Sequence, residues 1–366
     1  MRLGIVRLYF GESGKKGFYN SQEIGLARAM KKIGYEIYIF IPNPNITIIE
    51  EESEEEGIKV IYVPAKTVGV HSRFYWKVLE NYKIDVVQLE ADNQIFAPDI
   101  ISYCDKNHIL LYLYIGVTES DTNYKTKKFL FDILFRRNIR SYKSHMCFAK
   151  TPSVNKQLNT LGIYHTELAP VGLDIEVIPQ IDDSKLELRN MLGLPINKTI
   201  ILYVGRMDEY KRPLEAINLI EELNDNYYLI MIGEGSLYYN IKDEILKKNI
   251  ANRVIQIRQI PNKDIHKYYI SSDYLLNFNS KEIFGMSILE AMYQGCTVLA
   301  YHASGPDYII ENGISGYLCN DITEMKHIIE SNTMLNKEKI KSRIVENFAW
   351  KKTAAIFDRW IKQNYK

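Results

Sequence analysis

The chain alternates short apolar runs with longer segments of helical periodicity, and this alternation limits the folds open to it. In the first half, runs such as LLYLYI are nearly continuous in apolar residues, as in strands buried on both faces of a parallel sheet under helices. The predicted strands are 3–9, 36–41 (closed by Pro42), 59–63, 85–89 and 109–114. An amphipathic helix is predicted at 21–33, ending at Gly34.

A second series of the same kind begins after residue 195. It predicts strands at 199–204, 227–232, 254–257, 274–278 and 297–300, with a helix at 212–223. Two such series in 366 residues predict two doubly wound α/β domains. The Pro/Gly segment 169–174 is the expected join, so the predicted domains are 1–170 and 171–345.

Composition and charge limit the kinds of partner that the protein can bind. Lys and Arg total 46 against 45 Asp and Glu, so no global field attracts nucleic acid. The four cysteines form no C-x-x-C pair and are interpreted as buried free thiols, and scattered histidines argue against a metal site. No leader is visible, and no apolar run reaches the roughly 18–20 residues of a membrane span. We therefore expect a cytoplasmic protein, with peripheral membrane attachment left open. The acidic run 50–56 is expected to be a solvated loop.

A basic turn follows the first strand of the second series. Arg206 and Lys211 flank a strand-to-helix turn that starts at Gly205, and Pro213 suits the helix start because its missing N–H would be unbonded there. Two cations at the carboxyl end of a parallel sheet can hold a diphosphate. Taken alone, a solvated basic turn explains these residues equally well.

Two carboxylates, Glu282 and Glu290, bracket a loop predicted to open a helix over 287–293, with Ser287 near its cap. Gly285 allows a close backbone approach to a ligand, and free N–H groups at a helix start bind phosphate. Glu290, expected in the first turn, can accept hydrogen bonds from ribose hydroxyls, and Glu282 can face a sugar. A charge favouring the helix dipole is the alternative for Glu290.

A glycine-rich turn, 11–17, follows the first strand of the chain. It is neither G-x-G-x-x-G nor a P-loop, but it suits an approach to phosphate, with a plain surface loop as the alternative.

Together these motifs resemble the retaining glycosyltransferases of family 4 (glycosyl transferases group 1), which have the GT-B fold of two Rossmann-like domains facing an interdomain cleft. The matching pieces, in order, are G-R-x4-K (205–211), G-E-G (233–235), E-x7-E with F-G inside (282–290), 295–300, S-G-P (304–306) with 310–317, and F-A-W (348–350). The resemblance is strong over 195–366 and weaker over 1–170. It implies that residues 346–366 form a terminal helix crossing back to the N-terminal domain.

The resemblance also implies roles. Arg206 and Lys211 would neutralise the diphosphate, Glu290 would bind ribose, and Glu282 would face the sugar. The remaining donor contacts it implies are Gly17, Gly205, Ile260 in a base-binding loop, Phe284, Gly285, Met286 and Ser287. It implies no metal and no cofactor, and UDP-sugar is the commonest donor in the family.

One departure lies in the N-terminal domain, where many relatives have a histidine at a strand end and this chain has Ile115. The sugar-side contact from this domain is therefore unassigned. Acidic residues near strand ends are candidates for the acceptor side, with structural loop acids as the alternative: Glu90, Asp92, Glu119 and Asp121.

The segment 125–143 combines an apolar cluster at helical spacing with flanking Lys and Arg residues. It is interpreted either as a helix that lies on an anionic membrane or as a packed helix with a basic rim. The acceptor can be a glycan, a glycolipid or a small molecule. Two other functions stay open: a sugar-nucleotide epimerase or phosphorylase, and a donor-binding partner subunit without catalysis, which Ile115 would favour.

Overall fold

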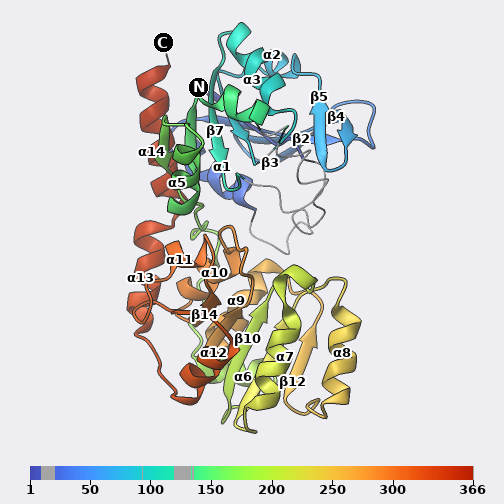
Figure 1. The fold of residues 1–366 in the computed structure, drawn as a ribbon, viewed down its shortest axis with the longest axis vertical. Coiled ribbons are helices and arrows are strands. Elements are labelled where there is room, and N and C mark those ends of the chain that lie inside the picture. The colour runs from blue at the N-terminus through green and yellow to red at the C-terminus, as the bar shows by residue number, and fades with distance from the viewer. Residues whose placement is uncertain (10–20, 93, 119–132, 134–135, 366) are drawn as a thin grey trace. The chain divides into compact units, whose positions relative to one another are not determined.

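The computed structural model describes residues 1–9, 21–92, 94–118, 133 and 136–365 (Figure 1). It divides the chain into two compact units. Unit 1 contains Ser21–Gly172, Trp350–Lys366 and the N-terminal strand, and unit 2 contains Leu173–Ala349. The chain therefore leaves unit 1 at Gly172, returns at Trp350, and ends in a helix that belongs to unit 1.

Unit 1 is built on a sheet of nine strands among its described residues, in the order β3-β4-β2-β1-β6-β7-β8-β9, with β5 pairing to β4. Strand β1 (Arg2–Val6) lies at the centre, parallel to β2 (Glu36–Asn43) on one side and to β6 (Val86–Glu90) on the other. The other strands are β3 (Glu50–Glu55), β4 (Ile58–Val68), β5 (His71–Phe74), β7 (Leu110–Ile115), β8 (Met146–Ala149) and β9 (Thr166–Leu168).

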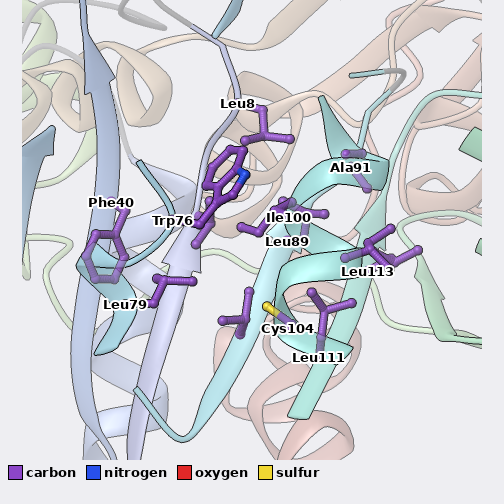
Figure 2. Close-up of a cluster of buried hydrophobic side chains, with 14 of the residues drawn as sticks. Leu8, Phe40, Trp76, Leu79, Leu89, Ala91, Ile100, Cys104, Leu111 and Leu113 are labelled. Carbon is purple, nitrogen blue, oxygen red and sulfur yellow. The ribbon is translucent and has the colours of Figure 1, made fainter. Parts of the chain in front are cut away.

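Capping residues set the ends of helices in unit 1. In α1 the Ser21 side chain accepts a hydrogen bond from the amide of Ile24, and Gly34 follows the helix with a φ of 97°. The helices are α1 (Gln22–Lys32), α2 (Val78–Asn81), α3 (Ala97–Lys106), α5 (Pro152–Thr160) and α14 (Trp350–Asn364). Strands and helices share a buried core (Figure 2), which includes Leu8, Trp76, Leu89 and the buried thiol of Cys104.

Two expectations for unit 1 are wrong. The acidic run is the edge strand β3, antiparallel to β4, not a loop, because β4 supplies a hydrogen-bonding partner that local composition does not reveal. Charge on an edge strand also opposes pairing with other chains. Pro42 does not close β2, which continues to Asn43. Since Pro42 is the next-to-last residue of β2, its missing N–H removes at most one hydrogen bond near the strand end.

Unit 2 has an all-parallel sheet in the order β12-β11-β10-β13-β14-β15. Numbered from β10, this is 3-2-1-4-5-6, the doubly wound order. Its strands are β10 (Thr199–Val204), β11 (Tyr227–Ile232), β12 (Val254–Ile257), β13 (Tyr274–Asn277), β14 (Thr297–Tyr301) and β15 (Tyr317–Cys319). Its helices are α6 (Lys185–Met191), η1 (Glu209–Lys211), α7 (Pro213–Glu222), α8 (Tyr238–Lys247), α9 (Asn262–Ser271), α10 (Met286–Tyr293), α11 (Pro306–Ile309), α12 (Ile322–Glu330) and α13 (Lys337–Asn347).

All four cysteines are buried and unpaired, as expected. No helix in the described part of the chain is long and apolar enough to cross a membrane.

Candidate functional site

The winding of the unit 2 sheet reverses between β10 and β13. These strands are parallel neighbours, with Ile201 opposite Tyr274 and Tyr203 opposite Leu276. The loops that leave their carboxyl ends therefore start side by side, at the place where open α/β sheets bind ligands. The first loop contains the motif 205–213 that the sequence singled out, and the second loop, 278–285, contains the start of the motif 282–290.

The loop after β10 is held in a fixed shape. The hydroxyl of Tyr203 donates to the carbonyl of Arg206 at 3.1 Å, and lies 3.4 Å from that of Lys211. Gly233 lies directly against this loop, since a Cβ added there would be 1.9 Å from the carbonyl oxygen of Gly205. Pro213 is the first residue of α7, as predicted. The G-R-x4-K and G-E-G motifs are thus packed against each other.

Lys211 and Glu282 join the two loops. The Lys211 ammonium lies 2.5 Å from Glu282 Oε2, and the amides of Asn277 and Asn279 each lie 3.3 Å from the same oxygen. Glu282 is 8% exposed. Its other oxygen, Oε1, makes no hydrogen bond with the described residues, so it is left to accept one from a ligand.

Helix α10 begins one residue earlier than expected, at Met286, with Gly285 as its N-cap. Gly285 has a φ of 102°, a conformation that favours glycine. Ser287, expected near the cap, is the second helical residue, and Gly285 turns the chain without a side-chain cap. Within the described hydrogen bonds, the amides of Met286 and Ser287 have no acceptor, as is usual at a helix start.

Glu290 is the fifth helical residue, so its expected place in the first turn is wrong. Its carboxylate is buried, accepting from the Tyr269 hydroxyl at 2.8 Å and the Asn262 amide at 3.3 Å. Asn262 opens α9 directly after the loop that contains the buried Ile260. Glu290 therefore ties α9 and the 259–261 loop to α10.

Arg206 is the most exposed of these charges, with 64% of its side chain accessible, and it pairs with Asp208 at 2.8 Å. Asp208 also accepts from the Ser236 amide and hydroxyl, each at 2.9 Å. Burial raises the pKa of Asp208, but these hydrogen bonds and Arg206 outweigh it, so that the pKa is lowered overall. Asp208 thus stays ionised and anchors Arg206.

The Phe284 side chain is not available to a ligand. It is 2% exposed and packs edge-on against Tyr308 and Phe348. Gly305 closes over its backbone, since a Cβ there would lie 2.2 Å from the Phe284 carbonyl oxygen. Since Gly305 covers the carbonyl and Cα of Phe284, a ligand contact at this position must be made by the backbone amide.

Unit 1 has its own switch point, between β1 and β6, and there the charges face one another. The Lys150 ammonium, after β8, lies 3.1 Å from Glu90 and 3.5 Å from Asp92. Asp92 also accepts from the amides of Gly116 and Val117. Burial raises the pKa of Glu90. Burial lowers the pKa of Lys150, but Asp92 and Glu90 outweigh it, so that Lys150 stays charged.

Several predicted residues receive no support from a contact. Ile115 ends β7 and lies in the core, 1% exposed, so it offers no polar group. Gly17, Glu119 and Asp121 lie outside the described residues, as does most of 125–143. Within that segment, Ile133 is 47% exposed and Asn138 is buried, donating to the Gln94 carbonyl.

Sequence reasoning missed Lys150, Tyr203 and the pair Asn277 and Asn279. Each lies in or just after a strand that was predicted or visible as an apolar run, so a polar residue at a strand's carboxyl end was the available signal. Among the described residues, no group of three His, Cys, Asp or Glu side chains is placed to hold a metal ion.

The chain is similar in sequence and in fold to known proteins. Residues 184–349 match the family described as Glycosyl transferases group 1. An uncharacterized glycosyltransferase of Methanocaldococcus jannaschii is 25% identical, over 89% of this chain and 91% of that protein. Three other curated relatives match more locally, and the chain spans only 37–42% of their length.

Two solved structures resemble the chain over nearly its whole length. Sucrose-phosphate synthase from Thermosynechococcus elongatus has a TM-score of 0.80 at 16% identity, covering 99% of this chain and 98% of that one. Anabaena HepE, solved in complex with UDP-glucose, has a TM-score of 0.73 at 16% identity, covering 99% and 100%. These similarities show the fold.

The fold is therefore GT-B, built from two Rossmann-like domains. The match of residues 184–349 to the family Glycosyl transferases group 1 supports a transferase enzyme.

Proposed function

We propose that the protein is a retaining glycosyltransferase of family 4 that moves a sugar from a nucleotide diphosphate sugar to an acceptor hydroxyl. The observation that carries the proposal lies at the unit 2 switch point. There a group 1 domain brings together Lys211, the partly free carboxylate of Glu282 and the open start of α10.

The diphosphate is assigned to the positive groups of this site. Lys211 and Arg206 neutralise it, and the amides of Met286 and Ser287 donate to its oxygens. Such fixed donors stabilise the charge that develops as the leaving group departs, often the largest catalytic effect. The proposal includes no metal and no cofactor, and a chelator tests this directly.

The sugar and nucleoside are assigned to the carboxylates and the neighbouring loop. Glu282 Oε1 accepts from a sugar hydroxyl, while Lys211 and two asparagines fix its other oxygen. Glu290 accepts from ribose, and the backbone around Ile260 contacts the base. The backbone of Gly205, Phe284 and Gly285 completes the donor contacts. UDP is the proposed nucleotide, which is supported by the UDP-glucose complex of HepE.

In the reaction, the bond between the anomeric carbon and the phosphate oxygen breaks, and the acceptor oxygen bonds to that carbon on the same face. The acceptor proton passes to the departing phosphate. No side chain acts as nucleophile.

Unit 1 supplies the acceptor side, with Glu90 and Asp92 as its described candidates and Glu119 and Asp121 as further predictions. Gly17 remains a predicted contact to the donor phosphates. A glycan, a glycolipid or a small molecule each fits this proposal. A cytoplasmic location, with membrane contact through 125–143, also stays a prediction.

Thermal unfolding with UDP, GDP, ADP, CDP and dTDP tests the proposal, each with and without chelator. A ligand that binds only the folded state adds about 2.7 kcal/mol at 100 times its dissociation constant. We expect UDP to stabilise the protein equally with chelator, and less in Glu290→Gln, which can still accept from Tyr269. Stabilisation by none of the nucleotides would refute the donor site.

Donor turnover separates a transferase from a binding subunit. If UDP and UDP-sugars bind but no sugar donor releases UDP with any acceptor tested, the partner-subunit function would be favoured instead.

A further inference from the structure

A hollow of about 760 Å³ lies in unit 1, and Glu90, Asp92 and Lys150 are not among its lining residues. It is formed by the loop after β2, the far half of β4, strand β5, and helices α2 and α3. Its apolar wall is aromatic: Phe74, Tyr75, Trp76 and Tyr103. The volume lies within the range of about 300–1,000 Å³ typical of small-molecule sites.

The charged groups of this hollow are mostly cations. Lys66, Arg73 and Lys77 line it with a single carboxylate, Glu80, which already accepts from the Tyr103 hydroxyl. Cationic side chains only donate hydrogen bonds. The hollow therefore suits a ligand that brings negatively charged acceptors, and suits a neutral sugar poorly, since its hydroxyls also need acceptors.

Two of these cations face each other across a hairpin. Lys66 and Arg73 are direct cross-strand partners of β4 and β5, so their side chains share a face. Like charges in this position destabilise a hairpin. Arg73 lies 3.9 Å from Asp99, a carboxylate that also pairs with Arg137. Lys66 and Lys77 make no ion pair with the described residues. An anion bound between Lys66 and Arg73 would relieve the repulsion.

Apolar surface continues beyond the hollow. Tyr75 is 75% exposed on its rim, and the adjoining loop and hairpin tip expose Ile48 (71%), Val68 (59%) and Val70 (61%). A ligand with a chain longer than the hollow would find apolar contacts along these residues.

We propose that this hollow binds a single-chain lipid phosphate, with the phosphate between Lys66 and Arg73 and the chain along the aromatic wall. The biological role of this lipid phosphate, as the carrier of a lipid-linked acceptor, rests on the proposed function. The binding of the lipid phosphate to the hollow does not.

Isothermal titration calorimetry without nucleotide tests the site, with decyl phosphate as the probe. Decyltrimethylammonium has the same chain with the opposite charge, and inorganic phosphate has the same head without the chain. We expect decyl phosphate to bind saturably, at least about tenfold more tightly than either. The double variant Lys66→Gln/Arg73→Gln should weaken it about tenfold, from two exposed charge contacts.

Two controls make the result specific. Lys106→Gln/Lys156→Gln removes the same charge from exposed sites of unit 1 outside the hollow and should change the affinity by less than about twofold. Tyr75→Ser should weaken decyl phosphate but not inorganic phosphate. Thermal unfolding checks that each variant folds.

Three outcomes would overturn the proposal. Equal binding of both decyl probes would show unspecific apolar adsorption, and equal binding of inorganic and decyl phosphate would show a plain anion site. Cosedimentation with vesicles of anionic lipid, lost in the Lys66/Arg73 variant, without binding of monomeric decyl phosphate, would assign the hollow to a membrane surface. In all three cases the nucleotide site of unit 2 is untouched.

Discussion

The switch points of the two units have the same strand order around them, but their charges are balanced differently. In unit 1, Lys150 is 7% exposed and Glu90 12% exposed at the side chain, and the lysine is enclosed by two carboxylates. In unit 2, Lys211 is 22% exposed and Arg206 64% exposed. In the unit 1 cluster the charges pair with one another, whereas in unit 2 the cations and the amides at the start of α10 remain accessible to a ligand.

This difference shows that the strand order sets where a site can lie, whereas the side chains at that place determine whether a ligand can bind there. Removing one member of a buried, paired charge cluster lowers the stability of the fold strongly, because it leaves a buried charge without a partner. Partly exposed cations beside an open helix start cost the fold little free energy when no ligand is bound, and they bind an anion favourably. The same substitution at the two switch points should therefore have opposite consequences.

The largest expected effect is on transfer, from Lys211→Met. Loss of this ammonium should lower kcat about 10²- to 10³-fold. It should cost about 1–2 kcal/mol of stability, less than the matched change in unit 1, because Asn277 and Asn279 still donate to the nearly buried Glu282 carboxylate. Release of nucleoside diphosphate from the donor measures kcat, with Lys247→Met on exposed α8 as the control. An unchanged kcat would remove Lys211 from the catalytic site.

The matched change in unit 1, Lys150→Met, should act on stability instead. It leaves the mostly buried Glu90 and the partly exposed Asp92 without their cation and should cost up to about 3–5 kcal/mol. All three tryptophans, Trp76, Trp350 and Trp360, lie in unit 1, so urea unfolding followed by their fluorescence reports on this unit.

Adding Glu90→Gln should restore part of the lost stability. Because burial raises the pKa of Glu90, the penalty of Lys150→Met should also shrink as the pH falls and the carboxyl takes up a proton. A stability penalty that changes neither with Glu90→Gln nor with pH would mean that Lys150 stabilises the protein through packing.

A third prediction concerns His266, which is fully buried beside Tyr269, the partner of Glu290. Burial lowers its pKa to about 4 from the ordinary 6.5. A lowered pKa means that stability is complete above pH 6.5 and is lost as the pH falls toward 4, here by about 3 kcal/mol. This loss should be absent in His266→Gln.

Unit 2 contains no tryptophan, so circular dichroism, compared with fluorescence, measures this loss. If fluorescence shifts as much as dichroism, the two units do not unfold separately, and the difference between wild type and His266→Gln becomes the decisive quantity.

The smallest expected effect comes from Asp208→Asn, which frees the exposed Arg206. An exposed ion pair contributes up to about 1 kcal/mol, so the donor KM should rise no more than about fivefold with kcat nearly unchanged. A loss as large as that of Lys211→Met would show that Asp208 itself contacts the ligand.

The sequence by itself determined the local elements of this protein. Apolar periodicity located most strands within one or two residues, since burial on both faces leaves a mark in each run. Gly233 lies where the backbone comes close to a neighbouring loop, and Gly285 where it turns sharply. Because loops leave a parallel sheet at the carboxyl ends of its strands, the motif positions alone indicated the edge where Arg206, Lys211 and Glu282 lie.

Only the tertiary structure decided which side chains meet. Lys211 pairs with Glu282 across 71 residues because β10 and β13 are neighbours in the sheet. Lys150, after β8, reaches Glu90 at the end of β6 across 60 residues and over the intervening strand β7. The acidic run became a strand because β4 offered it an edge. Local periodicity records whether a residue is buried and how the chain turns, but the partner of a charge is set by which strands become neighbours in the sheet.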